Sequence, residues 1–357
     1  MRILHVITSL RTGGAEKLMV DLLPRLRDLG HEVELCVFDG LRTPFYEALE
    51  AKGIHVIPLH VGGSVYDPRN IFLLISLIKK YDVVHTHNTA CQMYVAMANV
   101  FAKKCVVTTE HSTSNRRRGY PVLKWIDAWM YRQYQTIVTV SDIAGQNIKD
   151  YIGDASLPIM TITNGIDVNR FSRAEPCQEI INAYKDCFSC VMVAGFRYEK
   201  DHTTAIKAFS VLEEKYHLFL VGDGEKRGEL ETLVASLCLD GRVHFLGVRM
   251  DVPNLLQAAD VVIMSSHREG LSLSNLEGMA SGKPFIASDV EGLHEIVDGA
   301  GILVPHQDAE ALAAQISRCC LDKEYAAEVG ARCHLRAQQY DIKKMAVQYS
   351  RLYQKNG

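Results

Sequence analysis

The amino-acid sequence predicts an α/β protein built from two doubly wound, Rossmann-like domains that face each other across a cleft. Short β-branched apolar runs alternate with longer amphipathic runs, which is the pattern of a parallel sheet with crossover helices. The alternation stops over residues 171–179, where polar residues and a proline take over, and then restarts. A chain of 357 residues, 48% of them hydrophobic, is also long enough for two separate cores.

The expected strands follow one another at similar intervals in each half. Seven precede the interruption, with the sequences RILHVIT, EVELCVF, IHVIPL, DVVHTH, CVVTTEH, TIVTVS and IMTITNG. Six follow it: CVMVAG, YHLFLVGDG, VHFLG, VVIMSS, PFIASD and GILVP. We therefore expect an N-terminal domain over residues 1–172 and a C-terminal domain over residues 173–339. Apolar spacing in residues 340–357 predicts a helix that returns to the first domain.

Composition excludes several classes of protein. The strongly apolar run over residues 71–78 is far shorter than the ~20 residues that cross a bilayer. No cleavage-site pattern follows the first strand, so we expect a cytoplasmic protein. The net charge of −3 gives no reason to expect a nucleic-acid partner, although residues 1–172 carry 19 basic against 16 acidic residues and the rest 20 against 26.

The ten cysteines are scattered and several lie in apolar runs, which favours reduced, buried thiols over a disulfide framework. Cys187 and Cys190 form a C-x-x-C pair, but Cys190 opens an apolar run and no second pair or histidine lies at ligand spacing. We expect these two residues to pack in the core.

The segment HREGLSLSNLEGMASGKP places two glutamates around the expected start of a helix. Glu269 lies just ahead of the helix and Glu277 about two turns into it. A helix N-terminus attracts anions, phosphate above all, through the backbone amides of Gly270, Leu271 and Ser272. Eight positions span up to ~12 Å of helix, about the distance from a sugar across a diphosphate to a ribose. The pattern predicts a nucleotide sugar; the alternative is two exposed carboxylates favoured by the helix dipole.

Two other strand ends carry groups suited to phosphate. Gly13 and Gly14 precede a helix and would let the backbone approach a ligand, although such a pair is often only a turn. The pattern G-x-G-x-x-G is absent, which disfavours a dinucleotide site. Arg197 and Lys200 follow the strand CVMVAG and could neutralise a departing diphosphate; the alternative is a solvated basic loop.

The chain resembles the retaining glycosyltransferases of the GT-B class, and within them family 4, also called glycosyl transferases group 1. The Glu-x7-Glu segment in EGLSLSNLE is the most specific mark of this resemblance, which covers nearly the whole length. The other segments that carry it are GGAEK, DVVHTH, TEHS, VTVSD, NGID, EKD, VGDG, HFLG and EIVDGAGILVP.

The resemblance implies a role for each glutamate: Glu269 would hold hydroxyls of the donor sugar and Glu277 the ribose. The amides of residues 270–272 would bind the distal phosphate, and Lys200 would neutralise the leaving diphosphate. The turn at residues 245–248, with Val248, would lie against the base.

In the first domain, the resemblance implies that Gly13 and Gly14 approach the phosphates or the acceptor. His111 would point toward the donor sugar. The alternative is a structural role, in which backbone groups at the strand end hydrogen-bond the ring of this histidine. One departure is Gly195, because the family usually has an arginine there; Arg197 could supply that charge.

Metal-free catalysis is expected, and no cofactor beyond the nucleotide-sugar donor. No two aspartates lie two residues apart, so the Asp-x-Asp motif of the metal-dependent glycosyltransferases is missing. His85 and His87 share one face of a strand, but no third ligand is evident at a recognisable spacing.

The resemblance implies transfer of a hexose from a nucleotide-diphosphate sugar, with a UDP-sugar as the expected donor, to a glycan or lipid-linked acceptor in surface polysaccharide synthesis. No carboxylate is a clear nucleophile, which favours attack on the face from which the phosphate leaves. The basic segment at residues 115–120, with Lys103 and Lys104, could contact an anionic membrane; a solvated loop is the alternative. Two rival functions remain, a nucleotide-sugar epimerase of the same fold and a non-catalytic nucleotide-sugar-binding protein.

Overall fold

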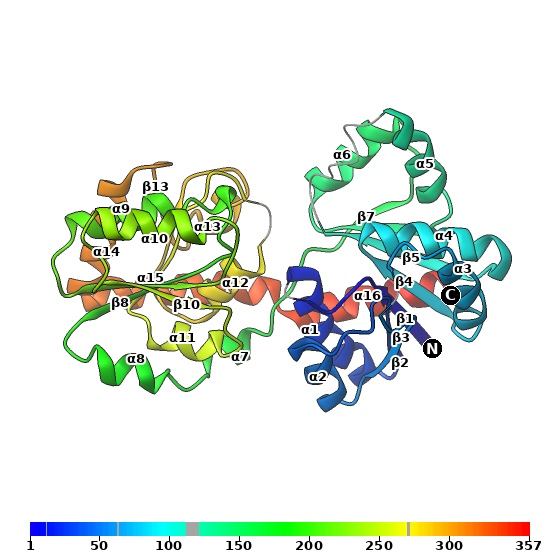
Figure 1. The fold of residues 1–357 in the computed structure, drawn as a ribbon, viewed down its shortest axis with the longest axis horizontal. Coiled ribbons are helices and arrows are strands. Elements are labelled where there is room, and N and C mark those ends of the chain that lie inside the picture. Colours follow the sequence, from blue (N-terminus) through cyan, green and yellow to red (C-terminus); the bar gives the residue numbers. More distant parts are fainter. Residues whose placement is uncertain (12, 63, 112–120, 270–271) are drawn as a thin grey trace. The chain divides into compact units, whose positions relative to one another are not determined.

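The computed structural model describes the chain except for residues 12, 63, 112–120 and 270–271. It divides into two compact units, one of Met1–Gly165 with Ile342–Gly357 and the other of Ile166–Asp341. Each unit has one parallel sheet with helices on both faces (Figure 1). The expected fold class is confirmed at this level.

Unit 1 has a seven-stranded parallel sheet in the order β3-β2-β1-β4-β5-β6-β7. Its strands are β1 (Arg2–Ile7), β2 (Glu32–Val37), β3 (His55–Pro58), β4 (Val83–His87), β5 (Cys105–Glu110), β6 (Thr136–Thr139) and β7 (Ile159–Thr161). Its helices are α1 (Gly14–Asp28), α2 (Pro44–Ala51), α3 (Arg69–Ile78), α4 (Thr89–Ala102), α5 (Pro121–Tyr131), α6 (Asp142–Ile152) and the C-terminal α16 (Ile342–Asn356). The central strand β4 is buried along its whole length, which explains why the side chains of His85 and His87 do not contact solvent.

Unit 2 has a six-stranded parallel sheet in the order β10-β9-β8-β11-β12-β13. Its strands are β8 (Phe188–Val193), β9 (Tyr216–Val221), β10 (Val243–Gly247), β11 (Val261–Met264), β12 (Phe285–Ser288) and β13 (Ile302–Val304). The helices are α7 (Val168–Ser172), α8 (Gln178–Ala183), α9 (His202–Val211), α10 (Arg227–Ser236), α11 (Val252–Ala258), α12 (Leu273–Ala280), α13 (His294–Val297), α14 (Ala309–Leu321) and α15 (Lys323–Ala337). Two single 3-10 turns, η2 (Tyr198–Lys200) and η3 (Gln338–Tyr340), complete it.

All thirteen expected strands are present, and the first unit ends at Gly165, ahead of the division expected after residue 172. The difference has a physical cause, because Val168 and Phe171 of α7 are buried in the core of unit 2. The returning helix α16 packs on α1 and buries Tyr349 and Tyr353 completely. The expectation of a C-terminal helix on the first domain is confirmed.

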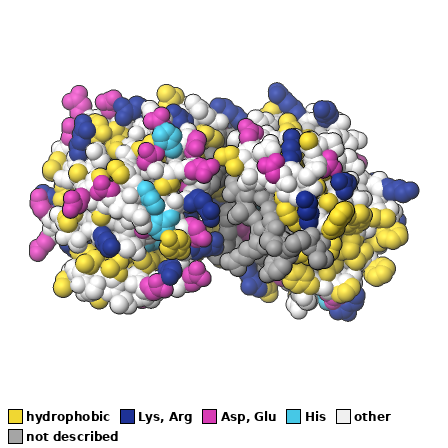
Figure 2. Space-filling model, turned by 90° about the horizontal axis from the view of Figure 1, so that it is seen from above, with side chains coloured by type: hydrophobic (Ala, Val, Ile, Leu, Met, Phe, Trp, Pro, Cys, Tyr) yellow, Lys and Arg dark blue, Asp and Glu magenta, His cyan; other side chains and the backbone are white. Residues whose placement is uncertain are grey.

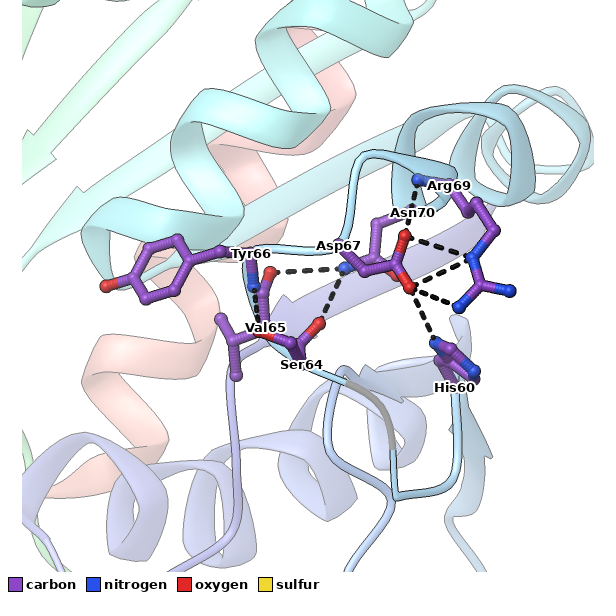
Figure 3. A network of polar contacts seen from close by, with 7 residues as sticks. All are labelled: His60, Ser64, Val65, Tyr66, Asp67, Arg69 and Asn70. Carbon is purple, nitrogen blue, oxygen red and sulfur yellow. Dashed lines mark hydrogen bonds and ion pairs between the residues drawn. The ribbon is translucent and has the colours of Figure 1, made fainter.

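Side-chain caps set the start of several helices. Thr43 accepts a hydrogen bond from the amide of Tyr46 at α2, and Ser141 accepts one from Ala144 at α6. Ahead of α3, the carboxylate of Asp67 binds the guanidinium of Arg69 and lies 3.6 Å from Nδ1 of His60 (Figure 3). The bonds from Arg69 lower the pKa of Asp67 to about 2, so this helix start stays charged over the ordinary pH range.

All ten cysteines are free thiols, and Cys190 is fully buried, as the scattered pattern predicted. In the part of the chain that the structure describes, no helix has the length and apolar character of a membrane span. Acidic and basic side chains are interspersed over the visible face, and hydrophobic side chains gather on unit 1 (Figure 2).

Candidate active site

The two loops that carry the predicted donor-binding residues of unit 2 meet at the point where its strand order reverses. Strand β8 pairs with β11, and the chain proceeds outward from them in opposite directions. The loops that leave the carboxyl ends of two such strands separate, and ligands of doubly wound sheets bind in the resulting crevice. The amide of His267 donates to the carbonyl of Glu199 at 2.9 Å, which ties the loop after β11 to the loop after β8.

Lys200 and Glu269 form an ion pair in this crevice. Nζ of Lys200 lies 2.5 Å from Oε2 of Glu269, and their side chains are only 19% and 7% exposed. The hydroxyl of Ser266 donates to the same carboxylate oxygen at 3.3 Å. Two residues that the sequence separates by 69 positions are therefore in contact, and the partly buried pair is stronger than its surface counterparts.

Helix α12 follows this pair. Gly270 and Leu271 lie outside the described residues, and Ser272 is the N-cap, with an extended backbone and no side-chain cap. Glu277 is 2% exposed and Glu269 is mostly buried. The alternative of two solvated carboxylates at a helix start is therefore excluded by their burial.

Asn275 is a candidate site residue that the sequence analysis did not identify. Its side chain is fully buried, and among the described residues neither Oδ1 nor Nδ2 has a hydrogen-bond partner. Leaving such an amide unpaired costs about 1–3 kcal/mol, which a polar ligand or water beside it would remove. The sequence feature that could have indicated Asn275 is its position, two residues before Glu277 in the same helix.

Glycine shapes the neighbouring turns through close backbone packing. A Cβ on Gly222, where φ is 144°, would lie 2.1 Å from the carbonyl oxygen of Ala194, and one on Gly224 would lie 2.5 Å from that of Phe196. The VGDG turn therefore packs against the loop that carries Lys200, and any larger residue would displace that loop.

Arg197 lies beside the glycine where the family usually has an arginine. A Cβ on Gly195 would lie 3.7 Å from Nε of Arg197, an ordinary van der Waals distance. Arg197 itself is exposed, and no ion pair joins it to another described residue. Its guanidinium therefore occupies space next to position 195 and is available to an anion.

Val248 follows β10 and is 55% exposed. The preceding Gly247 has φ 65° and accepts a hydrogen bond from the amide of Gly222 at 2.9 Å. An exposed apolar side chain thus stands at the carboxyl end of the sheet, next to the turn that packs on the Lys200 loop.

Unit 1 has a corresponding switch point between β1 and β4. Gly13 is the N-cap of α1, and a Cβ there would lie 2.1 Å from Oε2 of Glu16, whereas one on Gly14 would meet no atom within 4 Å. The carboxylate of Glu16 therefore folds back over the helix N-terminus, where burial raises its pKa and a hydrogen bond from Asn88 partly offsets that effect. Asn88 has φ 79°, an uncommon conformation for a side-chain-bearing residue.

Four histidines form a buried hydrogen-bonded chain behind this point. Nε2 of His111 lies 2.9 Å from Nδ1 of His87, and Nε2 of His87 lies 2.9 Å from Nδ1 of His5. Nε2 of His5 lies 3.4 Å from the hydroxyl of Tyr353 on α16, which lies 2.6 Å from Nδ1 of His85. The chain joins the end of β5 to the C-terminal helix.

His5, His85 and His87 have the ligand spacing of a metal site, with His5 as the third residue that the sequence reading did not identify. Each of their six ring nitrogens already has a hydrogen-bond partner, the last being Thr109, 2.7 Å from Nε2 of His85. A hydrogen-bonded network accounts for this cluster without an ion.

Burial keeps the histidines neutral. It lowers the pKa of His5 to about 3 and that of His111 to about 4, and it lowers the pKa values of His85 and His87 well below the usual range. A neutral imidazole has one N–H and one acceptor nitrogen, so hydrogen bonds along the chain must all run in one direction.

We infer that direction from the two contacts of the Tyr353 hydroxyl. We assign its proton to the shorter contact, with His85, so that His5 Nε2 donates to the tyrosine oxygen. His87 then donates through Nε2 to His5, and His111 donates through Nε2 to His87. Nδ1 of His111 is left as an acceptor, with no partner among the described residues.

Known proteins resemble the chain over nearly its whole length. Residues 12–170 match the family described as Glycosyltransferase Family 4, and residues 177–334 match Glycosyl transferases group 1. An Escherichia coli protein named UDP-Gal:alpha-D-GlcNAc-diphosphoundecaprenol alpha-1,3-galactosyltransferase is 27% identical over 72% of each chain. A Mycolicibacterium smegmatis phosphatidyl-myo-inositol mannosyltransferase is 26% identical, over 96% of this chain and 90% of its own.

Solved structures show the same fold. Anabaena HepE in complex with UDP-glucose superposes with a TM-score of 0.86 at 22% identity, over 99% of this chain and 100% of its own. The glycosyltransferase WaaG, involved in lipopolysaccharide biosynthesis, superposes with a TM-score of 0.71 at 16% identity, over 98% and 99%. Together with the family matches in both halves, they confirm the two-domain GT-B architecture, and this chain belongs to glycosyltransferase family 4, the glycosyl transferases group 1.

Proposed function

We propose that this glycosyltransferase moves a hexose from a UDP-sugar to a glycan or lipid-linked acceptor, with retention of anomeric configuration, in the synthesis of a surface polysaccharide. The observation that carries the proposal is the Lys200–Glu269 pair at the switch point of unit 2, followed by the buried Glu277 on α12. This arrangement offers a cation for a diphosphate between two carboxylates for hydroxyl groups.

The choice of donor and acceptor class is supported by the relatives. The Escherichia coli protein is named for a UDP-galactose donor and a diphosphoundecaprenol acceptor, and HepE was solved with UDP-glucose. The Mycolicibacterium smegmatis enzyme is named for a phosphatidylinositol acceptor. A uridine nucleotide and a lipid-linked acceptor are therefore the first pair to test.

Each candidate site residue has a binding role in the proposed complex. Glu269 accepts hydrogen bonds from hydroxyls of the donor sugar, Glu277 accepts them from the ribose, and Val248 packs against the base. Lys200 and Arg197 neutralise the diphosphate, and the backbone amides of residues 270–272, which precede α12 in the chain, bind the distal phosphate. Asn275 gains the partner that its buried amide lacks.

Unit 1 supplies further groups in this proposal. The space beside Gly14 is open, so a substrate can approach the start of α1 there. The space beside Gly13 becomes available when the carboxylate of Glu16 moves away. Nδ1 of His111, the acceptor end of the histidine chain, receives a hydrogen bond from a sugar hydroxyl. A hydroxyl donor suits it because the low pKa keeps this imidazole neutral.

The transfer step needs no nucleophile from the protein. The acceptor oxygen forms a bond to the anomeric carbon on the face from which the diphosphate leaves, and the carbon–phosphate oxygen bond breaks with its electron pair on that oxygen. The departing phosphate oxygen takes the acceptor's proton. Lys200 stabilises the negative charge that grows on the diphosphate, which is the kind of electrostatic assistance that gives the largest rate effects.

Product analysis tests this function against its two rivals. The purified enzyme is incubated with UDP-hexoses, with and without an undecaprenyl-diphosphate sugar, and the products are analysed by mass spectrometry and by NMR of the new linkage. We expect an acceptor-dependent product with the anomeric configuration of the donor. An altered hexose from donor alone would indicate an epimerase, and donor binding without transfer or hydrolysis would indicate a binding protein.

A lipid-linked acceptor would require contact with a membrane, and unit 1 has a suitable surface. Helix α3 packs on α4 and α4 on α5, and these three helices expose large apolar side chains: Phe72, Leu73, Val100, Phe101, Trp125, Ile126 and Trp129. Both tryptophans of the chain lie there, Trp125 with 81% of its surface exposed. Figure 2 shows hydrophobic side chains gathered on this unit. We call this set the α3–α5 apolar surface.

Basic residues accompany the α3–α5 apolar surface. Lys79, Lys80, Lys103 and Lys124 are exposed at the ends or on the faces of the same helices. The basic segment at residues 115–120 precedes α5 but lies outside the described residues. Aromatic side chains with flanking lysines suit the interface of an anionic membrane, which supports a peripheral position on the inner face of the plasma membrane.

Flotation with vesicles checks the membrane contact. We expect the protein to float with phosphatidylglycerol vesicles, and more weakly with phosphatidylcholine alone. Trp125→Ala should reduce flotation, while Leu335→Ala, which removes a similarly exposed apolar residue of unit 2, should not. Equal loss in both variants, or no preference for anionic lipid, would contradict the assignment.

A further inference from the structure

We propose that Asp201, His267 and His306 form a binding site for a divalent transition-metal ion, with Zn²⁺ as the best match, beside the Lys200–Glu269 pair. The three residues come from three different loops of unit 2. Asp201 follows η2 after β8, His267 follows β11, and His306 follows β13. All three loops leave the carboxyl side of the same parallel sheet.

Their ligand atoms are close enough to share one ion. Nδ1 of His267 lies 2.9 Å from Nε2 of His306 and 3.7 Å from Oδ2 of Asp201, and the three ligand atoms lie within 4.8 Å of one another. Zn²⁺ binds imidazole nitrogen and carboxylate oxygen at about 2.0–2.2 Å in tetrahedral geometry, which places neighbouring ligand atoms roughly 3.3–3.5 Å apart. To reach these lengths, the contact between His267 and His306 must lengthen and that between His267 and Asp201 must shorten, each by a few tenths of an ångström; the exposed His306 has room for the first change.

The donor set selects the class of metal. Two imidazoles with one carboxylate suit Zn²⁺, Co²⁺ and Ni²⁺, whereas Mg²⁺ and Ca²⁺ prefer all-oxygen sites. Three protein ligands also leave a tetrahedral ion one open position, which water or another oxygen group can take.

The residues around the three ligands hold two of them in place. Asp201 accepts hydrogen bonds from the amide and the hydroxyl of Thr204, at 3.2 and 2.7 Å. The ring of His267 packs against that of Tyr198 with 4.6 Å between centroids, and its amide is bound by the carbonyl of Glu199. Such outer contacts orient metal ligands and reduce the conformational entropy lost on binding.

The other histidine clusters lack either ring nitrogens that are accessible to an ion or a third ligand. His5, His85 and His87 are buried with every ring nitrogen hydrogen-bonded, as described above. His217 and His244 lie 3.0 Å apart through Nδ1 and Nε2, but they are not part of a three-ligand group. His294 pairs with Asp289 at 2.6 Å without a second histidine. The last two pairs therefore provide matched controls for the proposed site.

A bound ion would connect the loops that hold the catalytic ion pair. Asp201 adjoins Lys200 in the chain, and His267 lies two residues before Glu269. The metal would cross-link the loops after β8, β11 and β13 without being required for the transfer step. It would thus be a site of stabilisation or inhibition by metal, separate from the binding of the donor.

Metal titration tests the proposal. Untagged protein carrying Cys238→Ser, which removes the exposed thiol, is treated with chelator and titrated with Zn²⁺, Co²⁺ or Mg²⁺ by calorimetry. We expect one Zn²⁺ per chain, no binding of Mg²⁺, and a Co²⁺ absorption spectrum without a thiolate charge-transfer band. His306→Gln should weaken Zn²⁺ binding at least tenfold while leaving the folded fraction unchanged, since this side chain is exposed.

The control variants His244→Gln and His294→Gln should bind Zn²⁺ as the parent does. His267→Gln and Asp201→Asn should lose binding as His306→Gln does, and near- and far-UV circular dichroism establishes that each is folded. The proposal would be overturned by absence of stoichiometric Zn²⁺ binding, by full affinity in His306→Gln, or by loss of binding in either control.

Discussion

At the scale of single residues, the ion pair between Lys200 and Glu269 is the feature on which the proposed chemistry depends. Its side chains are largely screened from water, so the lysine holds its position before any donor is present. A preorganised cation stabilises charge in the transition state without reorganisation when the bond breaks. Asn275 and Glu277, both buried on the following helix, extend the same polar surface away from the pair.

Lys200→Ala should therefore reduce kcat/KM by about 10²–10³, the effect of removing one strong donor from a developing oxyanion. The kcat is expected to fall more than the donor's affinity, because the charge grows mainly in the transition state. Steady-state kinetics with the donor varied measures both. Lys226→Ala is the matched control, since Lys226 forms a comparable but exposed pair with Glu229; equal kinetics in the two variants would refute the role of Lys200.

The buried histidines predict a pH-dependent stability. Each pKa is lower in the folded protein than in the unfolded chain, so the unfolded chain binds more protons below about pH 6.5. Stability is therefore complete above that pH and falls as pH decreases toward the folded values, by up to about 1.4 kcal/mol per pH unit for each histidine. Urea unfolding between pH 7.5 and 5 measures the slope. A constant free energy of unfolding over this interval would show that the four imidazoles are not kept neutral by burial.

At the scale of elements, α16 is a part of the first unit that also contributes to its polar network. The hydroxyl of Tyr353 lies 3.4 Å from Nε2 of His5 and 2.6 Å from Nδ1 of His85, and that of Tyr349 lies 3.1 Å from Oγ1 of Thr109. The last helix of the chain thus reaches His111, more than two hundred residues earlier in the sequence. In the inferred hydrogen-bond direction, this helix sets which nitrogen of His111 carries the proton.

Tyr353→Phe tests this coupling. Loss of the hydroxyl leaves His85 Nδ1 and His5 Nε2 without their partner, at a cost of about 1–3 kcal/mol in stability. It also removes the group that fixes the direction of the chain, so the His111 tautomer, Nε2–H in the parent, should become mixed. The ¹⁵N shifts of histidine-labelled protein report the tautomer, and the exposed Tyr66→Phe serves as control. An unchanged His111 tautomer in Tyr353→Phe would contradict the assigned direction.

The elements were predictable because hydrophobic pattern alone determines them. Thirteen strands follow from period and β-branching, whereas the contact between Lys200 and Glu269 was not predicted, because it depends on the pairing of β8 with β11 at the switch point. The contact of His5 with His85 and His87 was not predicted, because it depends on the register of β1 against β4, which pairs residues eighty positions apart. The fold of Glu16 over Gly13 and the unpaired amide of Asn275 depend on rotamers, which no sequence pattern shows.

At the scale of the whole molecule, both units share a local backbone feature at their switch points. Each has a switch point with a side-chain-bearing residue in a left-handed or similar backbone conformation, Asn88 after β4 and Asp201 after η2. In unit 1 the carboxylate of Glu16 covers the start of α1, while in unit 2 Lys200 and Glu269 pair with each other ahead of α12.

Calorimetric titration of a panel of UDP-hexoses into the wild-type enzyme and into Glu277→Gln tests the central claim most directly. The account predicts saturable binding to the wild type and at least a tenfold weaker affinity in Glu277→Gln, because the amide replaces one acceptor oxygen by an NH2 donor and removes the charge that strengthens hydrogen bonds from the ribose hydroxyls. Glu324→Gln, on an exposed first turn of α15, should bind as the wild type does. Binding of no UDP-hexose, or equal affinity in Glu277→Gln, would contradict the assignment of this site to a nucleotide sugar.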